Sequence, residues 1–185
     1  MNGVDGGLKF AISVGQLIAS DLAGLGVTGK SVPASPAGAA QEERPQSGDE
    51  LLAEYDRRIQ NAEVRAATRS RFESRHYADA VEAGVKALNE RIRARTGRTE
   101  DGDGLMTLVF SVNKPLLRFN KLKSKADESE QRGHMLLCQG VVSAWRNPRA
   151  HALTYDDPLR CLMMLETIGD LIEKTNQAIR TRRHS

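Results

Sequence analysis

The stretch DPLRCLMMLETIGDLIEKTNQAI, residues 157–179, decides the fold class of this chain. Its apolar residues recur at alternating steps of three and four, the spacing that places them on one face of an α-helix. Asp157 followed by Pro158 is typical of a helix start, because aspartate caps the first turn and proline fits the first helical position. The stretch therefore predicts a long amphipathic helix, with a core face made of Leu162, Leu165, Ile168, Ile172, Thr175 and Ile179.

The same spacing extends upstream. We expect a helix over about 50–62 that Asp49 caps, then a second short segment that carries Val64, Ala67 and Phe72. Ser74 is expected to open a long helix that runs to about Arg95 and stops at Gly97. The core stripe of that long helix is predicted to be Tyr77, Val81, Val85, Leu88 and Ile92.

The middle of the chain continues in helical pattern. The DGDG turn (101–104) leads into LMTLVFS, a short helix or strand. Another helix is expected to start at Asp127 or Ser129. No alternating pattern is long enough to build a sheet, so the sequence predicts an all-α helical bundle. For the helix that is expected to start at Asp127 or Ser129, the predicted core stripe is Leu137 or Cys138, Val141, Val142 and Trp145.

The N-terminal quarter has a different composition. Residues 9–23 have helical spacing, but 26–48 are rich in Pro, Gly and small residues, as mobile linkers are. We divide the chain into 1–47, a poorly structured extension with one helix and a linker, and 48–185, the helical domain. GLGVTGKS (24–31) matches the phosphate-loop pattern. That motif needs a strand before it and a helix after it, and neither is indicated here, so we interpret the match as an accident.

Composition narrows the class of protein. With 27 basic and 24 acidic residues, the net charge of +3 is too balanced to predict nucleic-acid binding by itself. Cys138 and Cys161 lie in apolar helical patterns, which indicates buried, reduced thiols in a cytoplasmic protein. No stretch approaches the ~20 apolar residues that span a membrane. No cofactor or metal site is indicated.

The basic residues gather in four runs, 65–75, 91–98, 114–125 and 180–183.

The stretch AWRNPRAHALTYDD (144–157) is the candidate site. Trp145 ends an apolar helical pattern, and Pro148 is expected to break or kink the helix. Asn147 precedes the proline and is biased away from helical dihedrals. Such a break can aim Arg146 and His151 at one point, which ordinary helical spacing does not do.

Arginine and histidine together suit RNA cleavage. An arginine fork binds phosphate and stays charged, and a histidine can accept the proton of a ribose 2′-OH. These two groups suffice for a metal-independent route to a 2′,3′-cyclic phosphate. A loop in which these residues form an ion pair or cap a helix would explain the same stretch without a catalytic role. Arg71 and His76 in RFESRH have the same separation, where a solvated helix entrance accounts for them.

RNPRAH, between an amphipathic helix and one that begins at Asp157–Pro158, resembles the R-N-x-x-x-H signature of the HEPN superfamily. More narrowly, four blocks in order resemble the Ymh-like family of phage and bacterial proteins, over about 64–180. These blocks are HYADAVEAGVKALNERIRARTG (76–97), DGLMTLVFS (103–111), EQRGHMLLCQGVVSAWRNPRAH (130–151) and DDPLRCLMMLETIGDLI (156–172).

The resemblance implies a HEPN-like helical bundle and a homodimer in which two motifs face one cleft. It also implies that Arg146 and His151 are catalytic, with Asn147 shaping the bend between them. Arg149 and Tyr155, beyond the bend, are possible RNA contacts. The implied activity is an endoribonuclease of phage–host conflict or toxin–antitoxin defence. The alternatives are a non-catalytic dimeric module that binds RNA or protein, and a structural helper or antitoxin-like partner that forms a stable complex with a neighbour-encoded protein.

Overall fold

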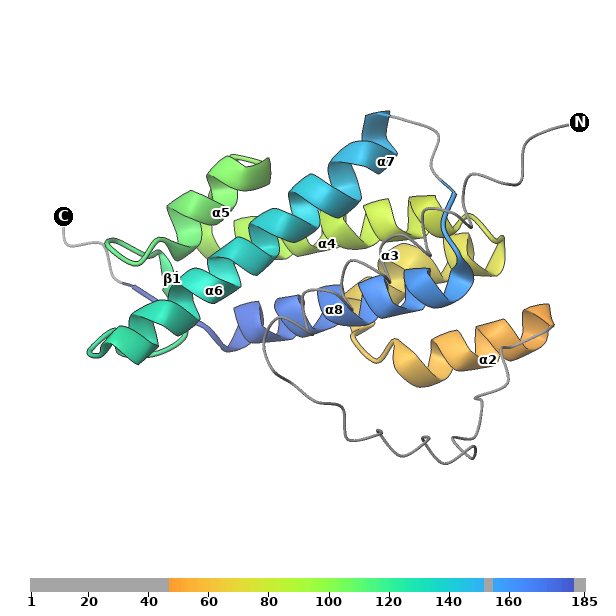
Figure 1. Cartoon of the computed structure of the whole chain (residues 1–185), viewed down its shortest axis with the longest axis horizontal. Helices are drawn as coiled ribbons and strands as arrows, with labels where there is room; N and C mark the ends of the chain where they lie inside the picture. Colours follow the sequence, from red (N-terminus) through yellow and green to blue (C-terminus); the bar gives the residue numbers. More distant parts are fainter. Residues whose placement is uncertain (1–46, 152–154, 182–185) are drawn as a thin grey trace, which may run out of the picture. The chain divides into compact units, whose positions relative to one another are not determined.

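The computed structural model describes residues 47–151 and 155–181, whose regular structure is helical apart from two strands of two residues each (Figure 1). This confirms the all-α prediction. The predicted helix over 9–23 and the phosphate-loop match lie outside the described residues, as does the predicted linker (26–48) except for Ser47 and Gly48, the cap and first residue of the first described helix. The boundary at 47/48 stays a prediction. The elements are α2 (Gly48–Arg58), α3 (Ala62–Glu73), α4 (Tyr77–Thr96), α5 (Gly102–Phe110), β1 (Leu117–Arg118), α6 (Lys125–Val141), η1 (Val142–Arg146), α7 (Asn147–His151), α8 (Pro158–Gln177) and β2 (Ile179–Arg180).

Side-chain caps set where the helices begin. Asp157 accepts from the backbone N–H groups of Leu159 and Arg160 and caps α8, as predicted. Gly97 ends α4 with a φ of 71°, the left-handed conformation that favours glycine.

Three predicted helix starts are wrong. Ser47, not Asp49, caps α2, because Ser47 and Glu50 form a reciprocal capping box. Ser124 caps α6 ahead of both predicted residues. Ser74 lies at the end of α3, and α4 begins at Tyr77.

The core lies where α4 and α8 run side by side (Figure 1). The predicted apolar faces of both helices are buried, except that Tyr77 is only half-buried and Ile179 is 49% exposed. The prediction for Ile179 is wrong because α8 ends at Gln177 and Ala178 is extended. Gly84 explains how closely the two helices approach, since a Cβ there would lie 3.0 Å from Leu165 Cδ2.

Several polar groups inside the core are paired, whereas Oδ1 of Asn89 and Oγ1 of Thr175 have no partner among the described residues. The hydroxyls of Tyr55 and Thr68 lie 2.8 Å apart. Gln131, fully buried on α6, donates to the carbonyls of Phe110 and Leu117 and accepts from the N–H of Phe119. One side chain therefore fixes the segment between α5 and β1 against α6. β1 then pairs antiparallel with β2, two residues each, which is too short for an alternating pattern to reveal.

Both cysteines are fully buried and unpaired, as predicted. Burial raises the pKa of Cys138 and of Cys161 to about 12. Within 47–151 and 155–181, no helix has the length and apolar character needed to cross a membrane.

Candidate active site

The segment with Arg146, Asn147 and His151 continues α6 instead of breaking from it. The π-helical turn η1 follows α6 directly and α7 follows η1, so the ribbon runs on without interruption (Figure 1). The predicted break at Pro148 is therefore absent. Asn147 has a φ of −59° and a ψ of −45°, which are helical values, so the expectation of a non-helical Asn147 is wrong.

The π turn explains how the helix accommodates Pro148. The N–H of Asn147 donates to the carbonyl of Val142, five residues earlier instead of four. Proline has no N–H, and in an α-helix its ring clashes with the carbonyl four residues before it. A π turn holds one more residue and loosens the backbone ladder at that point. The helix therefore passes through the proline into α7.

This continuity separates Arg146 from His151. Each helical residue turns by about 100° and rises by about 1.5 Å, so five residues leave the two side chains about 140° apart around the axis and about 7.5 Å apart along it. Within one chain they leave the helix in different directions. This contradicts the expectation that a bend aims both at one point.

Arg146 points into a polar cluster beside the start of α5. Its Nη2 lies 3.0 Å from Oδ2 of Asp101, and its side chain is 23% exposed. Asp101 Oδ1 accepts from Nδ2 of Asn89 at 2.7 Å and lies 3.5 Å from Nη1 of Arg93. The Nε of Arg146 is buried and has no hydrogen-bond partner among the described residues. Most buried polar groups in proteins are paired, so an unpaired donor at a candidate site calls for an explanation, and an acceptor supplied by a ligand is one.

Asp101 and Asn89 were missed in reading the sequence. The pattern around Asp101 was interpreted only as a turn, and its side chain does cap α5 by accepting from the N–H of Gly102. Asn89 gave a usable signal, because it is a polar residue next to Leu88 on the apolar face of a long helix. It is 1% exposed, and its Oδ1, like the Nε of Arg146, has no partner within the described ranges.

His151 and Asn147 face solvent. Both are exposed, and neither side chain makes a hydrogen bond or ion pair with any residue the structure describes. Trp145, just before them, packs half-buried against the core. The helix is therefore anchored immediately ahead of two free polar side chains.

Arg149 does not reach the surface as an RNA contact should. Its Nε and Nη2 donate to both carboxylate oxygens of Asp156, at 2.6 and 2.7 Å, and its Nη1 donates to the carbonyl of Trp145. Only 4% of its side chain is exposed. The expectation that Arg149 contacts RNA is corrected on this ground. Tyr155 is 93% exposed, so its ring is available.

Residues 59–173 match the model of a protein family described as "Protein of unknown function (Hypoth_ymh)". The chain belongs to this family. The matched range includes Asp101, Arg146 and His151, so the whole candidate site lies inside the family's shared region. No curated protein and no solved structure matches the chain.

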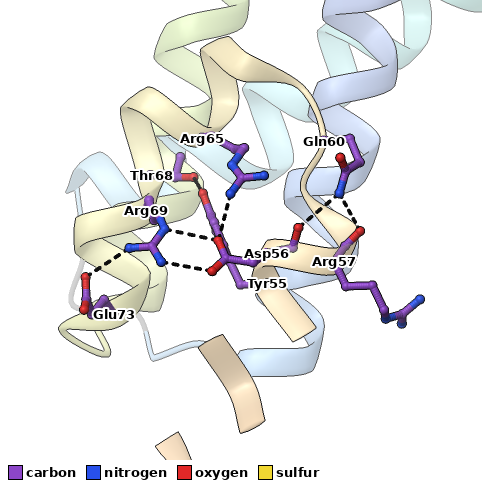
Figure 2. Close-up of polar contacts among 8 residues, drawn as sticks. All are labelled: Tyr55, Asp56, Arg57, Gln60, Arg65, Thr68, Arg69 and Glu73. Carbon is purple, nitrogen blue, oxygen red and sulfur yellow. Dashed lines mark hydrogen bonds and ion pairs between the residues drawn. The ribbon is translucent and has the colours of Figure 1, made fainter. Parts of the chain in front are cut away.

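In this member of the Hypoth_ymh family, two of the four arginines in the first basic run, Arg65 and Arg69, are neutralised by carboxylates. Arg65 Nη2 lies 2.9 Å from Asp56 Oδ1, and Arg69 Nη2 lies 2.9 Å from Asp56 Oδ2 (Figure 2). Arg69 also lies 3.5 Å from Glu73. Both arginines hold the pKa of Asp56 below its usual value, the hydrogen bonds from Arg69 most strongly. Arg65 and Arg69 are therefore held in internal ion pairs, whereas Arg71 and Arg75 of the same run are exposed and pair with no described carboxylate.

Arginines of the second run (91–98) also form ion pairs, whereas among the described residues the lysines of the third run (114–125) do not. Arg91 pairs with Glu63, and Arg93 with Glu90 and Asp101. In the run at 114–125, by contrast, four lysines are exposed and pair with no described carboxylate. They lie near β1, at the opposite end of α6 from α7 (Figure 1). These are Lys114, Lys121, Lys123 and Lys125.

Among the described residues, no three His, Cys, Asp or Glu side chains are grouped as ligands of a metal ion.

Proposed function

We propose that this protein is a metal-independent endoribonuclease in which Arg146 and His151 act on one RNA phosphodiester. The observation that carries the proposal is the buried Nε of Arg146, which has no partner among the described residues although the guanidinium is three-quarters covered. A phosphate oxygen is an acceptor that suits a guanidinium, as a carboxylate oxygen does. His151, exposed one helical segment later, supplies an imidazole that can transfer a proton.

The chemistry needs only these two groups. The ribose 2′-oxygen attacks the adjacent phosphorus while its proton passes to the imidazole of His151. Arg146 stabilises the charge that builds on the phosphate oxygens. The bond from phosphorus to the 5′-oxygen breaks, and that oxygen takes a proton from water. The products are a 2′,3′-cyclic phosphate and a 5′-hydroxyl.

A second copy of the chain is required. Within one chain the two side chains point about 140° apart, so the proposed site combines Arg146 of one chain with His151 of the other. An exposed or half-exposed stripe of small and apolar residues on α6, η1 and α7 supports such pairing, because large side chains such as Leu136 (56% exposed) and Leu137 (59%) are costly to leave in water. A Cβ at Gly133 or Gly140 would meet nothing within 4 Å. The stripe consists of Gly133, Leu136, Leu137, Gly140, Ala144, Asn147, Pro148 and His151.

Similarity to the HEPN superfamily supports the biological setting. The motif R-N-x-x-x-H at 146–151 is shared with small all-α ribonucleases of toxin–antitoxin and phage-defence systems. By that likeness we propose a role in phage–host conflict. A protein regulator that restrains the nuclease until infection belongs to the same proposal.

The second candidate is a non-catalytic dimeric module that binds RNA or protein. The ion pair between Arg146 and Asp101 favours it, because a carboxylate already holds the guanidinium. The four unpaired lysines near β1 also favour it, since a phosphate backbone is bound by such charges without catalysis.

The test mixes two inactive variants. Purified protein in EDTA is expected to cut single-stranded RNA and leave cyclic-phosphate ends, and Arg146→Ala and His151→Ala should each abolish cutting. Unfolding and refolding the two variants together should restore about a quarter of wild-type activity, because half of the dimers are mixed and each mixed dimer has one complete site. Arg71→Ala, an exposed arginine outside the site, should cut normally.

Each outcome decides between the candidates. No cutting by the wild type in any RNA, together with salt-sensitive RNA binding, would establish the binding module. Cutting that survives His151→Ala would remove the proposed mechanism. Cutting without restoration in the mixture would place both groups of a site in one chain.

A further inference from the structure

A groove of about 350 Å³ opens between the α3–α4 turn and the residues that precede α8. It is distinct from the cluster around Arg146 and Asp101, and no step of the proposed cleavage uses it. The groove combines a cation, an imidazole and two tyrosine rings. Its lining includes Arg75, His76, Tyr77, Asp79, Tyr155 and Asp156.

Arg75 supplies the positive charge of this groove. It is exposed, and no carboxylate among the described residues pairs with it. Of the two aspartates of the lining, Asp156 holds Arg149, and Asp79 lies 3.7 Å from Nδ1 of His76, which also lines the groove. The guanidinium of Arg75 is therefore available to an anion.

The backbone at Arg75 is held in a conformation that glycine would prefer. Its φ is 62°, and the N–H groups of Arg75 and His76 donate to the carbonyls of Phe72 and Arg71. This hydrogen-bond pattern ends helices with a left-handed residue, which is usually glycine. An arginine there costs stability, so the position allows a test in which folding and binding change in opposite directions.

Tyr155 supplies an aromatic surface at the rim of the groove. It is 93% exposed, which leaves most of its ring in water. The next residue, Asp156, is buried in its ion pair with Arg149 of α7, so the groove is tied to the helix that carries His151. His151 and Tyr155 are four positions apart in the chain, and four extended steps reach at most about 14 Å.

We propose that this groove binds one nucleotide of single-stranded RNA, with its base stacked on Tyr155 and its phosphate on Arg75. An exposed aromatic ring beside an unpaired cation is the arrangement by which proteins hold single strands without reading their sequence. The volume is within the range of small-ligand sites. The inference rests on the proposed function for its choice of RNA, and it adds a substrate subsite a few nucleotides from His151.

The test measures binding alone. A fluorescein-labelled single-stranded RNA with 2′-O-methyl groups cannot be cut by 2′-oxygen attack, so its Kd for the full-length protein reports binding with no contribution from cleavage. Tyr155→Ala should raise the Kd by about 5- to 150-fold, and Tyr155→Phe, which keeps the ring, should stay within about twofold.

Arg75→Gly separates binding from folding. It should weaken RNA binding and lower the slope of log K against log salt by about 0.7, the value for one phosphate contact on a single strand. Its melting temperature should equal or exceed that of the wild type, because glycine suits the left-handed backbone. Arg71→Ala removes a nearby exposed charge outside the groove and should change neither the Kd nor the slope appreciably.

Unchanged Kd values for Tyr155→Ala and Arg75→Gly would overturn the inference even if the protein cuts RNA. Equal loss of binding in Arg75→Gly and Arg71→Ala would also overturn it, because general charge would then explain the effect. If the wild type binds the methylated RNA through both residues but never cuts RNA, the groove stands and the ribonuclease proposal fails.

Discussion

Arg149 and Asp156 form a buried ion pair with two hydrogen bonds, and their side chains are 4% and 3% exposed. The pair joins α7 to the residues just before α8. Two charges so deeply buried are tolerated only while each compensates the other. The pair therefore fixes the position of α7, and with it the direction in which His151 points.

Removing one partner of this pair should destabilise the protein strongly. We expect Asp156→Ala to lower the free energy of unfolding by about 3–5 kcal/mol, because it leaves a buried guanidinium uncompensated. Lys86→Ala is the control, since Lys86 pairs with Glu82 but is 57% exposed, and its loss should cost no more than about 1 kcal/mol. Urea denaturation measures both. Equal costs would show that the pair does not fix α7.

The stripe on α6 should control association and not folding. Leu137 is 59% exposed, so Leu137→Arg should leave the helical circular dichroism unchanged while shifting the protein to the monomer in sedimentation. Leu165 is fully buried, and Leu165→Asp should unfold the protein, because an unpaired charge in the core is costly. A wild-type protein that sediments as a monomer would remove the basis of the shared site.

Asp101 should act through Arg146. If the carboxylate orients the guanidinium at 3.0 Å, Asp101→Asn should lower kcat for RNA cleavage on the order of tenfold and leave the melting temperature nearly unchanged. Asp103, in the same turn, bonds Ser143 and does not contact Arg146, so Asp103→Asn should keep kcat. An equal fall in kcat for both variants would mean that Asp101 has no special part.

His134 should make stability depend on pH. It is 7% exposed beside Phe110 and Phe119, and burial, aided by Lys174, lowers its pKa from 6.5 to about 4. Between these values the unfolded chain binds more protons than the folded one, so stability rises with pH. The contribution of neutral His134 to the free energy of unfolding is complete above about pH 6.5. It is lost as the pH falls toward 4, and it amounts to on the order of 3 kcal/mol in total.

Urea denaturation at pH 7.5 and pH 4.5 tests this dependence. His134→Leu should show a smaller difference between the two pH values than the wild type, because the buried imidazole is gone. Carboxylates titrate in both proteins and so cancel in the comparison. A wild type and a variant with parallel pH profiles would contradict the expectation.

The two cysteines should be inert until the protein unfolds. A pKa of about 12 for Cys138 and Cys161 leaves about a thousandfold less thiolate at pH 8 than an ordinary thiol with a pKa near 9. Reaction with DTNB should be correspondingly slow in buffer and fast in urea. Ala126→Cys places a thiol at an exposed position and should react at once.

The helical core could be predicted from spacing because burial alone decides it. Val81, Val85, Leu88 and Ile92 are all fully buried, as their recurrence at three and four indicated. The helix starts were harder to predict, because several residues near each start are chemically able to cap. Ser47 displaced Asp49 at α2 because Glu50 completes a capping box with it, a reciprocal contact that needs both side chains in place.

The candidate site was predictable in its residues but not in its geometry. The letters of RNPRAH indicated Arg146 and His151, yet the local rule for proline predicted a break that tertiary contacts override. Val142 is buried, Trp145 packs on the core and Arg149 is held by Asp156, so all three favour a continuing helix. The role of Asp101 was hidden for a similar reason, since its partner Arg146 lies 45 residues later in the chain.

Because of the π turn, the number of residues in this segment matters more than the identity of each residue. Between Val142 and Arg146, one deleted or inserted residue would rotate everything after it by about 100° around the axis of α6. Arg149 would then swing away from Asp156, and His151 would face another part of the surface. A point substitution at the exposed Ser143 leaves these directions unchanged, so family members are expected to differ by substitutions in this segment and not by insertions or deletions.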